Sequence, residues 1–269
     1  MDRSHRVVVA IASVVFAVLA YLSAGGLRRA VPPTSPPGSS ASGLAGGSER
    51  DNRVLGEIDL ARLFPDLVLR QGDVAAKNVA LTFDDGPDKQ YTPQILDVLA
   101  RKGVRATFFL IGNRLAESPE VVRRILAEGH AVGNHTYSHP NITTFTAQDI
   151  ERELRTADRE MSRFGARVTG MFRPPYGAVG VSSVEPLARA GYSLCLWTVD
   201  SLDWRGLTRE QVINNVLPLV ANGSVILFHS AGGPGEDLSG TVGALPVVID
   251  DLRAKGFKFV TLPEMFPRL

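Results

Sequence analysis

The most informative stretch of this 269-residue sequence is NVALTFDDGP, residues 78–87. Its apolar run, residues 79–83, has the length and composition of a buried β-strand. Two adjacent carboxylates, Asp84 and Asp85, follow directly. Because Asp-Gly-Pro is also an ordinary turn signal, the stretch alone predicts a buried strand and a turn. The same arrangement, an apolar run followed by polar residues, recurs along the rest of the chain.

Short apolar runs alternate with segments of helical spacing from residue 78 onward. Capping signals at Pro119, Thr146 and Thr208 indicate where helices begin. A last long helix is predicted from Thr241, after a glycine-rich loop at 232–243. The alternation predicts an α/β fold of parallel strands joined by helices, either a barrel or an open doubly wound sheet. The predicted strands are 79–83, 106–111, 130–133, 169–172, 192–199, 224–228 and 257–261.

Three segments precede this region. In residues 1–30, Arg3 and Arg6 are followed by the charge-free run VVVAIASVVFAVLAYL at 7–22 and then by Arg28 and Arg29. This pattern predicts an export signal or a membrane anchor. Cleavage after Val18-Leu19-Ala20 remains an alternative to the retained anchor that we favour. Residues 31–50 are rich in Pro, Gly and Ser and predict a linker, and residues 51–77 predict a lead-in packed on the edge of a domain at 78–269. We expect that domain at the extracytoplasmic face of the membrane, or secreted.

Composition excludes several classes of protein. The 29 basic and 28 acidic residues give a net charge of +1, which argues against general nucleic-acid binding. One cysteine, Cys195, excludes an internal disulfide and any multi-cysteine metal site. The sequence contains neither the G-x-S-x-G elbow of serine hydrolases nor a G-x-x-x-x-G-K-[ST] nucleotide loop.

Histidine, aspartate and arginine gather after five of the predicted strands. Because the carboxyl ends of parallel strands share one face of an α/β fold, these residues predict a single active site. The residues are Asp84, Asp85, His135, His139, Arg173, Asp200, Asp203 and His229.

A metal site is predicted from the His-x3-His pattern of His135 and His139. Four residues apart on a helical turn, both rings would reach one point. With Asp85 they form a two-histidine, one-carboxylate set, which leaves open positions on the ion and is typical of catalytic sites. Non-haem iron uses the same set, but nothing else indicates an oxygenase, so zinc is favoured.

Other strand ends offer groups for binding and proton transfer. In RPPYG (173–177) the prolines fix a turn. This turn is either structural only, or it places the Arg173 guanidinium near a carboxylate and a backbone N–H in the site. Trp204 follows two acids and is either a sugar-stacking platform or a buried residue. His229 is either an acid–base group or a core histidine.

Taken together, these segments resemble the polysaccharide deacetylase family, also called carbohydrate esterase family four. The five matching segments occur in order as TFDDGP (82–87), HTYSHP (135–140), RPPYG (173–177), DSLDW (200–204) and ILFH (226–229). The resemblance covers about residues 78–266. It implies a distorted, TIM-barrel-like (β/α)7 barrel and a divalent metal, usually zinc, with cobalt or another divalent ion as alternatives.

Residue roles also follow from the resemblance. It implies that Asp84 is the general base, oriented by Arg173, and that Asp85 binds the metal beside the two histidines of HTYSHP. Tyr176 would offer its backbone N–H to an oxyanion. Apart from the resemblance, we expect Tyr176 and Trp204 to contact substrate.

At the last two segments, the resemblance implies that His229 is the general acid. A carboxylate of DSLDW would steer it, for which we favour Asp203. Ser230 is a departure, because many members have aspartate after this histidine.

The function that follows is removal of acetyl groups from N-acetylglucosamine units of an extracellular polysaccharide. Export and a linker favour peptidoglycan as the substrate. Three alternatives stay open: a chitooligosaccharide or exopolysaccharide N-deacetylase, an O-acetyl esterase acting on a polymer such as xylan, and a non-catalytic glycan-binding barrel. No nucleic-acid or nucleotide partner is expected.

Overall fold

The computed structural model describes residues 60–167, 170–233 and 235–269. Its strands form one nine-stranded sheet in the order β1-β6-β5-β4-β3-β2-β8-β7, and β9 pairs with β2. Every strand pair in the described residues is parallel, as predicted. The strands are β1 (Val68–Leu69), β2 (Asn78–Asp84), β3 (Thr107–Leu110), β4 (Ala131–Asn134), β5 (Met171–Phe172), β6 (Ser193–Cys195), β7 (Val199–Asp200), β8 (Ser224–His229) and β9 (Lys258–Phe259).

The sheet curls into a distorted barrel because one segment belongs to both of its ends. The prediction of a single strand at 192–199 is wrong. This segment contains two strands, β6, which pairs with β5, and β7, which pairs with β8. Between them the backbone changes partners, since Leu196 N donates to Leu69 O and Thr198 N donates to Val225 O. Of the two predicted alternatives, the α/β barrel is therefore confirmed and the open doubly wound sheet is wrong.

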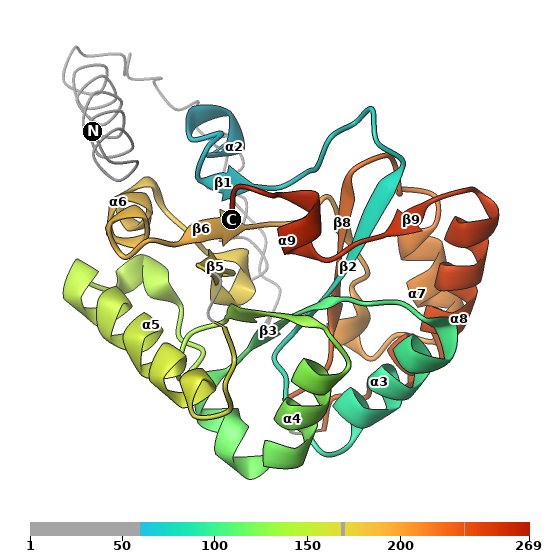
Figure 1. Cartoon of the computed structure of the whole chain (residues 1–269), viewed down its shortest axis with the longest axis horizontal. Coiled ribbons are helices and arrows are strands. Elements are labelled where there is room, and N and C mark those ends of the chain that lie inside the picture. The colour runs from blue at the N-terminus through green and yellow to red at the C-terminus, as the bar shows by residue number, and fades with distance from the viewer. Residues whose placement is uncertain (1–59, 168–169, 234) are drawn as a thin grey trace, which may run out of the picture.

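Helices surround the curled sheet (Figure 1). The predicted capping box of Thr208 with Gln211 forms. Thr146, predicted as a cap, also forms a capping box, with Asp149. The helices are α2 (Leu60–Leu63), α3 (Tyr91–Lys102), α4 (Pro119–Ala127), α5 (Ala147–Ser162), α6 (Val181–Arg189), α7 (Arg209–Val216), α8 (Ser239–Ala254) and α9 (Leu262–Met265).

Helix α8 begins before the predicted Thr241, so the loop prediction for 232–243 is wrong in its second half. The reason is packing at Gly240, which is buried against the backbone before α7. A Cβ atom there would lie 2.0 Å from the carbonyl oxygen of Leu207. Glycine here permits close helix contact and does not mark a loop.

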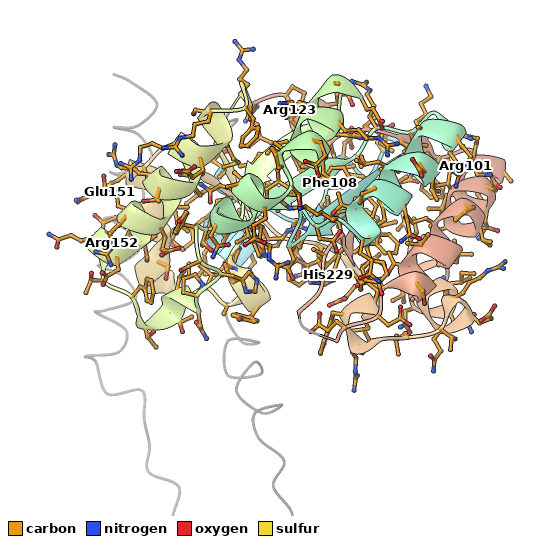
Figure 2. The ribbon with its side chains drawn as sticks, turned by 90° about the horizontal axis from the view of Figure 1, so that it is seen from below. Arg101, Phe108, Arg123, Glu151, Arg152 and His229 are labelled. Carbon is orange, nitrogen blue, oxygen red and sulfur yellow. The ribbon has the colours of Figure 1, made fainter. Side chains whose placement is uncertain are left out.

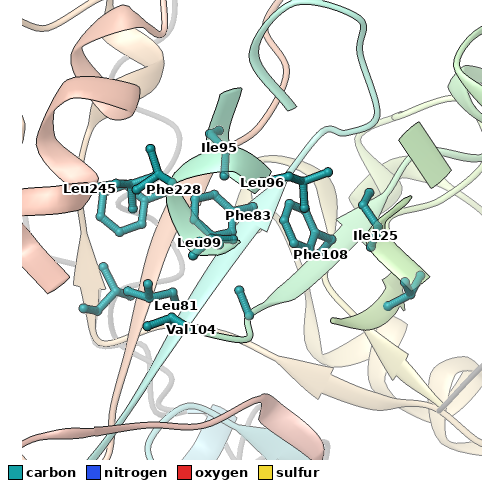
Figure 3. Packing of buried hydrophobic residues seen from close by; sticks show 14 of the residues in the cluster. Leu81, Phe83, Ile95, Leu96, Leu99, Val104, Phe108, Ile125, Phe228 and Leu245 are labelled. Carbon is teal, nitrogen blue, oxygen red and sulfur yellow. The ribbon is translucent and has the colours of Figure 1, made fainter. Parts of the chain in front are cut away.

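Strand β2 shows how the core is divided. Leu81 and Phe83 face outward into the main cluster under the helices, where Phe83 stacks between Phe108 and Phe228 at centroid distances of 5.1 and 5.7 Å (Figure 3). Ala80 faces the barrel interior. This alternation follows from the two-residue period of a strand. It points Thr82 and Asp84 inward, on the same side of the strand as the small apolar cluster that contains Ala80.

Residues 60–77 are part of the same packed structure. Helix α2 leads into β1, which pairs with β6 at the edge of the sheet. In the part of the chain that the structure describes, no helix is long and apolar enough to cross a bilayer. The predicted anchor at 1–30 and linker at 31–50 lie outside the described residues.

Candidate active site

Strand register brings the predicted residues to one end of the sheet. Asp84 and His229 are direct partners at the carboxyl ends of β2 and β8. On the neighbouring strands, Arg173 N donates to Asn134 O over 3.1 Å, which places Arg173 beside His135. The shared face predicted from the strand ends is therefore present.

Asp85, His135 and His139 form a cluster suited to a metal ion. Asp85 Oδ1 lies 3.2 Å from His135 Nε2 and 3.1 Å from His139 Nε2, and one ligand atom from each residue lies within 4.8 Å of the others. Asp85 Oδ1 is buried and accepts no hydrogen bond from any described residue. Zinc binds such atoms at about 2.0–2.2 Å, so the cluster fits a divalent ion.

The tautomer and charge of these groups also suit a metal. His135 Nδ1 lies 2.7 Å from the carbonyl oxygen of Arg173, which can only accept, so Nδ1 carries the proton and Nε2 is free to bind. Burial alone would raise the pKa of Asp85. The imidazoles of His135 and His139 instead hold that pKa well below its usual range.

The helical turn predicted for the two histidines is wrong. Residues 135–140 form a loop, in which Thr136 and His139 have positive φ angles of 69° and 61°. The rings still converge, with centroids 5.0 Å apart. Their meeting depends on this bent backbone and not on i, i+4 spacing.

Asp84 forms a buried ion pair with Arg173. Arg173 Nη1 lies 2.7 Å from Asp84 Oδ1, and the same nitrogen donates to Thr82 Oγ1 over 2.8 Å. Arg173 is fully buried, and its guanidinium lies over the rings of Phe109 and Trp197 at 4.2 and 5.4 Å. The other carboxylate oxygen, Asp84 Oδ2, remains 3.9 Å from His135 Nε2, facing the metal cluster.

His229 is held by Asp203. Its Nδ1 lies 2.7 Å from Asp203 Oδ1, and its backbone N–H donates to Asp203 Oδ2 over 2.9 Å. Burial of His229 favours the neutral ring, but the charge of Asp203, its hydrogen bond and the more distant Asp85 and Asp84 raise the pKa of His229 to about 9. His229 is therefore an imidazolium ion at neutral pH.

Neighbouring polar groups have other partners. Asp200 accepts from Leu202 N over 2.9 Å, and burial raises the pKa of Asp200. Ser230, the departure from the family pattern, donates its backbone N–H to Asp84 O over 2.9 Å. Of the two aspartates in DSLDW, the favoured Asp203 is the one that contacts His229.

Two aromatic side chains near the site reach solvent. Tyr176 is 60% exposed, and its hydroxyl lies 3.2 Å from His139 Nδ1. Trp204 is 44% exposed and directly follows Asp203, so the buried alternative for Trp204 is wrong. Tyr176 can therefore contact a ligand that approaches the metal cluster, and the ring of Trp204 is accessible from solvent.

The sequence did not predict three supporting residues. Asn134 accepts from Thr136 N over 2.8 Å, Glu153 accepts from Tyr137 and Ser138, and Thr241 Oγ1 donates to Asp203 Oδ2 over 2.8 Å. Asn134 directly precedes His135, a signal that could have indicated it. Glu153 and Thr241 lie in distant helices and carry no such signal.

Comparison with known proteins identifies the family. The family model described as polysaccharide deacetylase matches residues 71–215. A peptidoglycan-N-acetylglucosamine deacetylase of Bacillus cereus is 43% identical over 188 residues, which cover 70% of this chain and 68% of the relative. A chitooligosaccharide deacetylase of Bradyrhizobium is 37% identical over 204 residues, covering 72% of this chain and 93% of the relative.

A solved structure agrees with these matches. The peptidoglycan N-acetylglucosamine deacetylase Bc1960, in complex with 4-naphthalen-1-yl-N-oxidanyl-benzamide, superimposes with a TM-score of 0.72 and 39% identity. The match covers 76% of this chain and 94% of that one. The chain therefore belongs to the polysaccharide deacetylase family, carbohydrate esterase family four, whose deacetylases are metal-dependent hydrolases.

Proposed function

We propose that this protein hydrolyses the acetamide of N-acetylglucosamine units in peptidoglycan, with zinc bound by Asp85, His135 and His139. One observation carries the proposal: two residue pairs and one three-residue cluster, each with a different chemistry, lie together at one end of the barrel. They are the Asp84–Arg173 ion pair, the Asp85–His135–His139 cluster and the His229–Asp203 pair. Together they supply a base, a metal site and an acid.

Asp84 is the proposed general base. Arg173 binds one carboxylate oxygen, while the oxygen that faces the cluster can accept a proton from the attacking water. A bound metal would polarise the acetyl carbonyl and lower the pKa of water towards about 7. As Asp84 takes the proton, the hydroxyl oxygen bonds to the carbonyl carbon.

His229 is the proposed general acid. Its raised pKa keeps a proton available at neutral pH, and Asp203 holds Nδ1, so Nε2 is the atom that donates. Proton donation to the amide nitrogen allows the C–N bond to break, which releases acetate and a free amino sugar. We assign the backbone N–H of Tyr176 to the developing oxyanion, a type of contact worth about 3–4 kcal/mol.

Peptidoglycan is preferred because the relative with 43% identity carries that substrate in its name, and because the N-terminal sequence predicts export. Chitooligosaccharide is the second candidate, supported by the Bradyrhizobium relative. An exopolysaccharide N-deacetylase, an acetylxylan esterase and a non-catalytic glycan-binding barrel are the remaining alternatives. The intact set of a base, an acid and three ligand residues speaks against the last of these.

Acetate release distinguishes these candidates. We expect zinc-loaded protein to release more acetate from purified peptidoglycan than from chitooligosaccharide, a purified exopolysaccharide or acetylxylan, and Asp84→Asn to release little from any of them. Chelation should abolish release, and zinc or cobalt should restore it. Faster release from another polymer would reassign the substrate, and binding of glycan without acetate release would support the non-catalytic alternative.

We also propose that residues 7–27 anchor the enzyme in the membrane with residues 60–269 outside. The length and apolarity of the run support this. The protein should fractionate with membranes. Protease added to protoplasts, which lack the cell wall, should release residues 60–269 from the membrane. A soluble form that begins near Ser23 or later would instead show a cleaved signal peptide.

A further inference from the structure

The loop that carries His135 and His139 has a backbone that needs outside support. Positive φ angles at Thr136 and His139 are uncommon for residues with side chains. Such conformations persist where the surroundings hold them in place. The contacts of this loop therefore determine whether the two imidazoles converge.

On the carbonyl side, the loop is held by backbone groups. Gly112 N donates to Thr136 O and Asn113 N donates to Tyr137 O, each over 2.9 Å. A Cβ atom on Gly112 would lie 2.8 Å from the Tyr137 ring and 2.9 Å from Ala157 Cα. The missing side chain of Gly112 thus allows the loop and α5 to pack closely.

On the N–H side, the loop is held by one carboxylate of α5. Glu153 Oε2 accepts from Tyr137 N over 3.0 Å and from Ser138 N over 2.8 Å. Its other oxygen accepts from Ser138 Oγ over 3.0 Å. These three donors lie between the two histidines, and hydrogen bonds to a charged acceptor are stronger than neutral ones.

The nearby Glu151, on the same helix, has a different partner, which is not part of the histidine loop. Glu151 points outward from α5 (Figure 2) and pairs with Arg155 of the same helix, whose Nε lies 2.7 Å away. A long charged helix looks uniformly solvated in sequence, but Glu153 is directed at the histidine loop. The two glutamates therefore form a natural comparison.

We propose that Glu153 is a positioning residue that holds His135 and His139 in metal-binding geometry before the metal binds. This inference rests on the proposed function, in which both histidines are ligands. Without the Glu153 carboxylate, the N–H groups of Tyr137 and Ser138 lose their acceptor and the loop can relax. Residues that support metal ligands from behind typically change metal affinity by about 10–100-fold.

The test compares Glu153→Gln with Glu151→Gln in the same chain. Glutamine keeps the size of the side chain but removes its charge and one of two acceptor oxygens. Zinc and cobalt affinities are measured by competition with a chelator, and amide hydrogen exchange of Tyr137 and Ser138 is measured in metal-free protein. Thermal unfolding of both variants accompanies these measurements.

We expect Glu153→Gln to bind zinc about 10–100-fold more weakly and to exchange its loop amides faster, while Glu151→Gln matches wild type. Unchanged metal affinity in Glu153→Gln, even with a lower melting temperature, would overturn the inference. Should Glu153→Gln fail to fold, Ser138→Ala removes one of the three donors and should weaken zinc binding to a smaller degree; unchanged affinity there would also overturn it. If wild-type protein bound no divalent ion, the proposed function itself would fail.

Discussion

The charge of Asp203 should control the protonation of His229, and Asp203→Asn tests this directly. The pKa of His229 lies at about 9 in the folded protein against an ordinary 6.5. Each unit of pKa corresponds to about 1.4 kcal/mol, so the folded protein favours the protonated ring by about 3 kcal/mol. Asparagine keeps the shape of the side chain and removes its charge, so the pKa of His229 should fall, because burial of the ring then meets less opposition.

The assay is an NMR titration of the imidazoles in metal-free protein, with His229 assigned from the signal lost in His229→Gln. Stability gives a second measurement. Because folding raises this pKa, the stabilisation is fully present below pH 6.5 and is lost as pH rises through about 9. The free energy of unfolding of Asp203→Asn should therefore fall furthest below that of wild type near pH 6, and the difference should shrink above pH 9.

Thr241→Val is the matched control. It removes the hydroxyl that donates to Asp203 Oδ2 and leaves the carboxylate charge in place. Its effect on stability should be nearly constant with pH. If the pKa of His229 stays near 9 in Asp203→Asn, the charge of Asp203 is not what raises that pKa. The reasoning for the general acid would then be wrong.

Three further predictions concern the rest of the site. Asp84→Asn should retain zinc and lose about 10²–10⁴-fold in kcat, whereas Asp85→Asn should lose zinc. Metal content and kcat are measured for both variants, and an exchange of the two outcomes would show that the roles are reversed. Arg173→Met should lower the free energy of unfolding in urea by about 3–5 kcal/mol because it leaves the buried Asp84 charge unpaired, and adding Asp84→Asn should recover part of that loss; a double variant less stable than Arg173→Met would contradict this. Trp204→Ala should raise KM for a soluble chitooligosaccharide by up to about tenfold with kcat unchanged, and an equal loss in kcat would show that Trp204 acts in the transition state.

The positions of the candidate residues could be predicted because their chemistry is local in sequence. Asp85, His135 and His229 each follow an apolar strand, and parallel strands deliver their carboxyl ends to one face. The route by which the two histidines meet could not be predicted in the same way. Helical spacing and a bent loop both bring residues four apart together. The bent loop is supported by groups elsewhere in the sequence, such as Gly112 and Glu153.

The fold shows the same division. Hydrophobic periodicity locates strands and helices, but it cannot show that residues 192–199 pair with two different neighbours, because both halves of this run are apolar. Gly240 presents a related difficulty. A glycine indicates freedom of the backbone, and only the neighbouring Leu207 shows that a close contact requires it.

The two-residue strand β1 has a consequence for how residues 60–77 should be regarded. β1 pairs with β6 through Val68 and Leu69, and Phe64 and Leu67 are buried in the cluster beneath α5 and α6. A chain that began at Asn78 would leave the edge of β6 open, with its backbone groups and Leu194 available to another molecule. Long or open sheet edges promote aggregation, and a very short edge strand is a common protection. We therefore expect residues 60–77, by covering this edge, to reduce self-association of the enzyme.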